Sequence, residues 1–284
     1  MPGNTLTVGL KLSGQGTTVE ELRDVWRIAD DEGFDSCWDF DHFAGIGGDP
    51  ELDVFEAWTM LAAMAEATKR VRIGCMVTGN TYRHPAVLAK TAVTVDHLSG
   101  GRLEFGIGAA WAEIEHTMLG IDYGTVGQRI ARLDEACRLI KLLWTEDRAS
   151  FEGRYYRLED AIANPKPVQK PHPPIWIGGS GERKTLRVVA ELADVWNAPG
   201  GDPSEVARLS GVLDRHCEDV GRDPATIRRS VQTRFDGDVD SLLRRVEEYV
   251  AVGIDDVIVM LIGGSAKAHG ELAAETLPKL RAIG

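Results

Sequence analysis

The sequence predicts a (β/α)₈ barrel formed by a single domain over residues 1–284. The first observation is an alternation of strand-like and helix-like segments that repeats eight times along the chain. The second is that most of the strand-like segments are continuous apolar runs, as expected for strands covered by helices on one side and by a packed barrel interior on the other. The chain length of 284 residues also fits, because such barrels usually have about 250 residues.

The predicted strands are short segments rich in apolar residues. The first one ends before Ser13, Gly14 and Gly16, which predict a loop. The eight predicted strands span residues 6–12, 34–40, 71–77, 103–107, 175–177, 195–197, 227–235 and 256–261.

The segments between these strands carry apolar residues at helical spacing. In the first of them, Leu22, Val25 and Trp26 fall on one helical face, and Gly33 stands where a helix C-cap belongs. The predicted helices span residues 18–32, 54–68, 86–98, 113–119, 126–144, 182–192, 204–220, 242–252 and 268–283.

A doubly wound open sheet is the competing fold. Such sheets usually have fewer strands and carry an early Gly-rich turn that binds phosphate. Gly14 and Gly16 follow the first predicted strand but do not form that fingerprint. The sequence therefore favours the barrel.

Residues 150–174 interrupt the alternation. The segment contains Phe151, Tyr155, Tyr156 and five prolines, so it is too rich in proline for a helix and too aromatic for a flexible linker. We therefore expect a packed excursion between the fourth and fifth strands that covers the mouth of the barrel.

The charge balance argues against nucleic-acid binding. Lys and Arg total 32 and Asp and Glu total 44, which gives a formal net charge of −12, whereas binding to a phosphate backbone requires a basic face. Hydrophobic residues make up 43% of the chain and charged residues 27%, which excludes a disordered or fibrous protein. No run of about 18 apolar residues occurs, so we expect no membrane-spanning helix.

The cysteine pattern and the N-terminal residues predict a reduced, cytoplasmic protein. Residues 1–11 lack a basic region followed by an apolar run, so no signal peptide is expected. The cysteines form no CxxC motif and no Cys/His cluster, which predicts neither a metal site nor a disulfide framework. They are Cys37, Cys75, Cys137 and Cys217.

Candidate site residues follow the predicted strands, because barrel active sites lie in the loops after the strands. Asp41 and His42 come after the second strand. An imidazole titrates near neutral pH, so His42 could act as a general acid or base. A structural histidine bonded to a backbone carbonyl explains this position equally well. No Gly-x-Ser-x-Gly, HExxH or Walker motif is found, so the sequence offers little support for a hydrolase or metalloenzyme.

The Gly-rich stretch at residues 178–181 follows the fifth strand and precedes a predicted helix. Exposed backbone amides at a helix N-terminus bind anions, and glycine allows a phosphate to approach closely. Arg183 and Lys184 could add positive charge there, as could Arg83 after the third strand. The plainer interpretation is a simple strand-to-helix turn.

Several motifs in one collinear order resemble those of the luciferase-like oxidoreductases, which depend on flavin or deazaflavin. The similarity covers about residues 8–197, and the motifs together are more specific than any one alone. They are most similar to the branch that uses the deazaflavin coenzyme F420. The motifs are Gly33-Phe34-Asp35, Asp41-His42-Phe43, Val77 to Pro85, Asp96-His97, Ser99 to Leu103, Gly106 to Trp111, Pro173 to Gly181 and Ala193 to Asn197.

This resemblance implies an F420-dependent oxidoreductase in which a small organic substrate and the deazaflavin ring meet at the C-terminal face of the barrel. Asp41 and His42 match positions that flank substrate and ring, and His42 is similar to the catalytic residue of deazaflavin-dependent dehydrogenases. We hypothesise that His42 handles the substrate proton and that Asp41 sets the orientation of His42.

The resemblance also assigns residues to the cofactor. It implies a cis peptide bond near Cys75 and Met76 that supports the ring, with Thr78 against the ring and the loop at residues 178–181 around the phosphate. The cofactor-binding residues it implies are Asp41, Cys75, Met76, Thr78, Gly108, Gly178, Gly179, Ser180, Gly181 and Arg183.

Two departures from the family pattern bear on the substrate. Trp111 stands where the sugar-phosphate dehydrogenases carry an acidic residue, and Ile46 stands in place of a tryptophan that flanks the ring, so we do not expect a sugar phosphate. Two other functions stay open: an FMN-dependent monooxygenase that uses oxygen, and a barrel that binds a cofactor without turnover. The resemblance is compatible with a homodimer.

Overall fold

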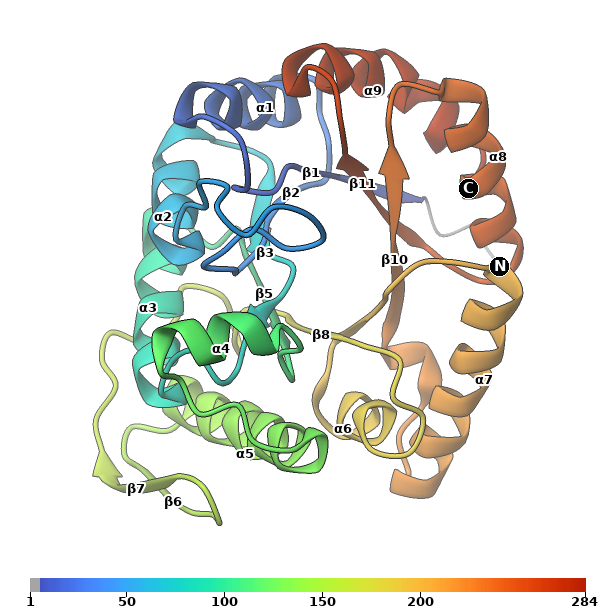
Figure 1. Ribbon diagram of the computed structural model, residues 1–284. Coiled ribbons are helices and arrows are strands. Elements are labelled where there is room, and N and C mark those ends of the chain that lie inside the picture. Colours follow the sequence, from blue (N-terminus) through green and yellow to red (C-terminus); the bar gives the residue numbers. More distant parts are fainter. Residues whose placement is uncertain (1–5) are drawn as a thin grey trace.

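The computed structural model describes residues 6–284 and confirms the closed parallel barrel (Figure 1). Each strand pairs in parallel with its neighbours, and pairing between β1 and β11 and between β3 and β5 closes the ring. A short strand, β4 (Thr78–Gly79), continues the third position and pairs with the end of β5. The other barrel strands are β1 (Thr7–Lys11), β2 (Ser36–Asp39), β3 (Arg72–Cys75), β5 (Leu103–Gly108), β8 (Ile175–Gly178), β9 (Val195–Ala198), β10 (Arg228–Phe235) and β11 (Asp256–Leu261).

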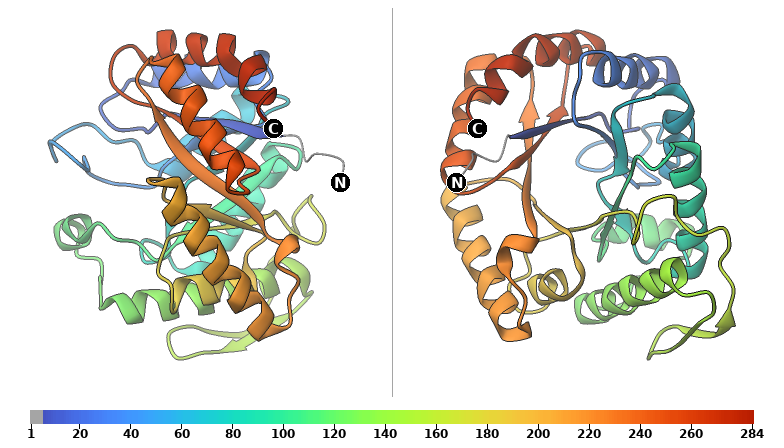
Figure 2. Two further views of the ribbon diagram at one scale, coloured as in Figure 1. Left: turned by 90° about the vertical axis from the view of Figure 1, so that its right-hand side faces the viewer. Right: turned by 180° about the vertical axis from the view of Figure 1, so that it is seen from behind.

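Helices surround the barrel and cover the outer face of its strands (Figure 2). The short helix α4 projects at the end of the barrel where the strands finish, on the same side as the long loop after β2. The helices are α1 (Val19–Asp31), α2 (Ala57–Ala67), α3 (Pro85–Leu98), α4 (Glu113–Leu119), α5 (Val126–Thr145), α6 (Thr185–Leu192), α7 (Pro203–Val220), α8 (Val239–Ala251) and α9 (Ala266–Arg281), with a 3₁₀ turn, η1 (Pro224–Thr226). In the described part of the chain, none of them combines the length and apolar character that a membrane span requires.

Capping side chains explain where several helices begin. Thr18 and Glu21 form a capping box at the start of α1. Asp238 accepts a hydrogen bond from the amide of Ser241, so α8 begins at Val239, three residues earlier than the apolar periodicity predicts. The opposite error occurs at α6, which begins at Thr185 and not at residue 182.

The excursion between α5 and β8 lies elsewhere than predicted. It forms an antiparallel hairpin of β6 (Ala149–Glu152) and β7 (Arg157–Ala161), and the Glu135 carboxylate on α5 accepts amide hydrogens of residues 154–156. Farther along, the Asp96 carboxylate at the end of α3 accepts the amide of Val168. The predicted position over the barrel mouth is therefore wrong. A connection from a helix to the next strand lies at the N-terminal face, whereas the mouth is built by strand-to-helix loops.

Candidate active site

A cavity of about 730 Å³ opens at the C-terminal ends of the barrel strands. Its walls come from segments that follow nearly all the strand positions, and they include polar and apolar side chains. The position agrees with the general location of active sites in this fold. The volume lies in the range of pockets that hold a cofactor or drug-sized ligand, about 300–1,000 Å³.

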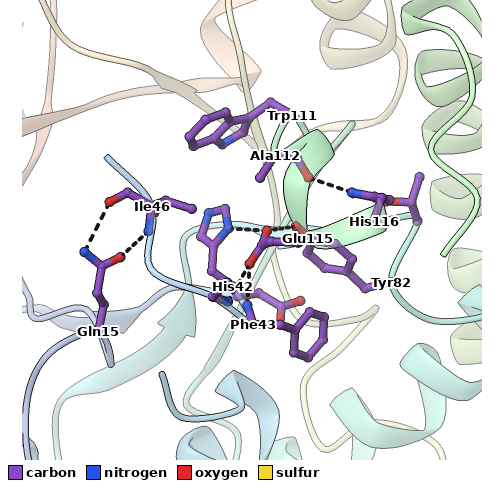
Figure 3. Close-up of polar contacts among 12 residues, drawn as sticks. Gln15, His42, Phe43, Ile46, Tyr82, Trp111, Ala112, Glu115 and His116 are labelled. Carbon is purple, nitrogen blue, oxygen red and sulfur yellow. Dashed lines mark hydrogen bonds and ion pairs between the residues drawn. The ribbon is translucent and has the colours of Figure 1, made fainter. Parts of the chain in front are cut away.

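His42 lines this cavity and is only 8% exposed. Its Nδ1 atom lies 2.8 Å from Oε2 of Glu115, as Figure 3 shows. An ionised carboxylate can only accept a hydrogen bond, so Nδ1 carries the proton. The Nε2 atom has no hydrogen-bond partner among residues 6–284 and is the ring atom left for a ligand.

Glu115 is a fully buried carboxylate on α4 that four donors hold in place. Besides the ring of His42, the amides of Phe43 and Ala44 donate hydrogen bonds to it. The Tyr82 hydroxyl is the fourth donor, with its oxygen 2.5 Å from Oε2. Burial opposes ionisation, but the hydrogen bonds from His42, Tyr82 and Phe43 outweigh it and lower the pKa of Glu115 to about 2. Glu115 is therefore a fixed negative charge beside the imidazole.

Asp41 does not orient His42, contrary to our hypothesis. Its buried carboxylate accepts a hydrogen bond from the Thr78 hydroxyl at 2.7 Å and two from the Arg83 guanidinium at 2.5 and 2.9 Å. Arg83 also pairs with Glu56, so it is not free to attract an anionic ligand. Asp41 and His42 are neighbours in sequence, yet they belong to two separate polar networks.

The segment after β3 differs from the prediction in the place of the cis peptide bond and in the residues that reach the cavity. The non-proline cis bond joins Met76 and Val77, one residue later than predicted. Met76 and Val77 line the cavity, whereas Cys75 and Thr78 are buried beside it and are not part of its wall. Protein groups already occupy the Thr78 hydroxyl. It donates a hydrogen bond to Asp41 and accepts one from the indole nitrogen of Trp58 at 2.6 Å.

Two of the predicted cofactor-binding residues, Gly108 and Gly178, lie against the side chain of Val77. A Cβ atom at Gly108 would lie 2.7 Å from Cγ2 of Val77, and one at Gly178 would lie 3.2 Å from Cγ1. Gly179 also lines the cavity and adopts a φ of +133°, which favours glycine.

The remaining residues of the Gly-rich loop lie outside the cavity wall. Ser180, Gly181 and Arg183 are exposed in the irregular segment that leads to α6. The helix predicted to follow the loop directly begins only at Thr185. The structure therefore brings Gly178 and Gly179 to the cavity, whereas Ser180, Gly181 and Arg183 are exposed and do not line it.

Sequence reasoning missed three contributors to the site: Glu115, Tyr82 and Lys11. Glu115 lies seven positions after Gly108 on a short helix, and no local pattern separates it from its exposed neighbour Glu113. Lys11 could have been found, because a lysine that ends a buried apolar strand is unusual and needs a polar partner.

The two positions that depart from the family pattern both border the cavity near His42 (Figure 3). The Trp111 ring lies 5.6 Å from the His42 ring, centroid to centroid, and 63% of Trp111 is exposed. Ile46 is held through its backbone by the Gln15 side chain. Within the described residues, no group of His, Cys, Asp and Glu is arranged to hold a metal ion.

Comparison with known proteins places the chain in a family. A family model described as luciferase-like monooxygenase matches residues 5–250. An F420-dependent glucose-6-phosphate dehydrogenase of Kineococcus radiotolerans is 33% identical over 84% of this chain and 70% of its own length. An FMNH₂-dependent dimethylsulfone monooxygenase of Pseudomonas putida is 26% identical over 92% of this chain and 73% of its own.

Solved structures agree on the fold. An F420-dependent secondary alcohol dehydrogenase, determined with an F420–acetone adduct, superposes with a TM-score of 0.87 at 20% identity and covers 97% of this chain and 99% of its own. Together with the match over residues 5–250, these findings confirm the resemblance seen in the motifs. The chain belongs to the luciferase-like monooxygenase family of oxidoreductases, and its relatives include F420-dependent dehydrogenases.

Proposed function

We propose that this protein is an F420-dependent oxidoreductase that moves a hydride between the deazaflavin and an oxygen-bearing carbon of a small organic substrate. The observation that carries the proposal is the His42–Glu115 pair. The imidazole presents an unpartnered Nε2 in the cavity while a fixed carboxylate holds Nδ1. Such a pair suits the proton transfer that accompanies the interconversion of an alcohol and a carbonyl.

The residues around the cavity fit a planar, tricyclic ring. Val77 forms part of one wall, and Gly108 and Gly178 lie close against it. The backbone at Gly178 and Gly179 can approach a phosphate closely. Arg183 and Lys184 are exposed next to this loop and could attract an anionic tail, although the net charge of the chain is −12.

When bound, the deazaflavin donates or accepts a hydride through one ring carbon. Nε2 of His42 accepts the substrate proton in the oxidative direction and returns it in the reductive direction. Glu115 stabilises the imidazolium that forms, because its charge is held 2.8 Å from Nδ1. Trp111 and Ile46 border the cavity near His42, on the side where the substrate would lie.

The first experiment is a titration of the purified protein with deazaflavin and, separately, with FMN, followed by cofactor fluorescence. We expect tight binding of deazaflavin and weak binding of FMN. A preference for FMN, together with a requirement for oxygen, would instead favour a monooxygenase such as the relative from Pseudomonas putida.

The second experiment tests the role of His42 by the His42→Ala variant. It should bind deazaflavin as the wild type does but lose turnover by about a hundredfold or more. The matched control is His97→Ala, because His97 is exposed on α3 and does not line the cavity. Unchanged turnover in His42→Ala would exclude the proposed role. If wild-type protein binds deazaflavin but turns over no alcohol or carbonyl compound in a broad screen, a binding function without catalysis gains support.

A further inference from the structure

Trp111 is a large apolar side chain that borders the cavity and stays uncovered. Its exposed fraction is 63%, although each residue from Gly108 to Trp111 lines the cavity. The indole ring lies against the His42 ring, with centroids 5.6 Å apart and ring planes at 68° (Figure 3). An exposed aromatic ring in a cavity wall is apolar surface that a bound ligand can remove from water.

The backbone around Trp111 is held in place. Ala110, directly before it, has a φ of +59°, a left-handed conformation that residues other than glycine rarely adopt. The Tyr123 hydroxyl donates a hydrogen bond to the carbonyl oxygen of Trp111 at 2.8 Å. The Tyr123 ring is fixed in turn by the guanidinium of Arg129, which lies 3.8 Å from its centroid. The fold therefore presents the indole in a defined place, and a surface prepared in this way loses less entropy when a ligand binds.

Two further apolar side chains lie near the ring of His42. The Phe40 ring lies 4.8 Å from the His42 ring, centroid to centroid, and Ile46 lines the cavity near it. Because Nε2 of His42 is the ring atom left for the substrate oxygen, substituents on the reacting carbon lie beside these side chains. The surroundings of the proton-transfer site therefore suit an apolar substituent, and the flat indole of Trp111 suits a planar one.

Two cations also line the cavity, Lys11 of β1 and Arg234 of β10. Lys11 donates hydrogen bonds to the carbonyl oxygen of Met76 and to Gln232. In the described part of the chain, neither cation is hydrogen-bonded to His42 or lies over the Trp111 ring. An anionic substituent would require one of these cations, so a substrate that carries a carboxylate is the competing class.

We propose that Trp111 determines substrate specificity by binding an aromatic substituent next to the oxygen-bearing carbon, so that the substrates are aryl-substituted alcohols or ketones. This inference rests on the proposed function, since it names the substrate class of that reaction. The coenzyme ring is the other group that an indole in this cavity could contact. We assign that ring to the wall at Val77, Gly108 and Gly178, whereas Trp111 contacts the ring of His42.

The test compares acetophenone, acetone and pyruvate as substrates of the enzyme loaded with reduced deazaflavin. The wild type should have its highest kcat/KM for acetophenone, and Trp111→Ala should lower that value about tenfold or more. The value for acetone should change by less than about twofold, because a methyl group covers little of the indole. Trp111→Phe, which keeps an aromatic ring, should recover most of the loss. Ile114→Ala is the matched control, because Ile114 is exposed on α4 and does not line the cavity.

A binding measurement separates this role from a structural role and from contact with the coenzyme. Acetophenone should bind to the enzyme loaded with oxidised deazaflavin, which has no hydride to give, and calorimetry should show about tenfold weaker binding in Trp111→Ala. The dissociation constant of deazaflavin itself should change by less than about twofold. A larger loss of deazaflavin affinity, in a variant that unfolds thermally like the wild type, would assign Trp111 to the coenzyme and overturn the inference.

The remaining outcomes distinguish the inference from the proposed function. A wild-type preference for acetone or pyruvate, or the absence of acetophenone binding to the loaded enzyme, overturns the inference and leaves the proposed function standing. Acetophenone kinetics and binding that Trp111→Ala does not change overturn it as well. If the wild type binds no deazaflavin in either redox state, the proposed function itself fails.

Discussion

The carboxylate of Glu115 and the ring of His42 meet across the mouth of the barrel, with Oε2 and Nδ1 2.8 Å apart. His42 follows β2, whereas Glu115 lies on α4 after β5, so two different strand–helix units supply the pair. The same carboxylate also accepts the amides of Phe43 and Ala44 and thereby fixes the loop that carries His42. Glu115 therefore positions both the ring and the backbone at the proposed proton-transfer site.

Glu115→Gln should reduce turnover while leaving deazaflavin binding nearly unchanged. A neutral amide cannot stabilise an imidazolium as a carboxylate does, so we expect kcat to fall by about a hundredfold. Steady-state kinetics together with a cofactor titration measures the two effects. Glu113→Gln, on the exposed face of the same helix, is the control and should behave as the wild type. Equal activity in a folded Glu115→Gln protein would contradict the role of this carboxylate.

Glu115 should also make folding stability depend on acid pH. Its pKa is about 2 in the folded protein and 4.5 ordinarily, so its ionised form contributes stability above about pH 5. That contribution, roughly 3 kcal/mol, is lost as the pH falls from 4.5 towards 2. Urea unfolding at several pH values should show the gap between wild type and Glu115→Gln shrinking in acid. A gap that is constant with pH would refute this assignment.

Arg83→Met should destabilise the fold because it leaves the buried carboxylate of Asp41 without its cation. Arg83 makes two hydrogen bonds to Asp41, whose side chain is completely buried. Breaking a buried pair in this way costs about 3–5 kcal/mol, to be measured by denaturant unfolding. Adding Asp41→Asn should recover part of the loss. Arg27→Met, which removes an exposed pair with Asp24, should cost less than about 1 kcal/mol.

Gly108→Ala should weaken cofactor binding by changing the shape of the cavity wall. The added methyl group would lie 2.7 Å from Cγ2 of Val77 and must displace this side chain. We expect the dissociation constant of deazaflavin to rise about tenfold. Gly211→Ala is the control, because a methyl group there lies on α7 with its nearest neighbour, an Arg215 nitrogen, 3.9 Å away. Unaltered affinity in Gly108→Ala would mean that the ring does not cover the Val77 wall.

Much of the fold could be predicted because local patterns encode it. Apolar runs and helical periodicity revealed all eight strand–helix units, and strand β11 matches its predicted bounds. Errors concentrate at helix starts, where a single side chain decides the boundary, as Asp238 does for α8. The excursion was misplaced because composition shows that a segment packs but not against which face.

The sequence by itself determined the barrel, its family and the segments that reach the C-terminal face, including Asp41, His42, Gly178 and Gly179. Only the tertiary structure decided which side chains meet there. His42 and Glu115 are 73 positions apart, and Lys11 and Gln232 are 221 apart, so no local pattern links them. The neighbours Asp41 and His42 were expected to act together but serve separate networks. Their partners come from different strand–helix units: Arg83 and Thr78, which follow β3, bind Asp41, whereas Glu115 on α4 binds His42.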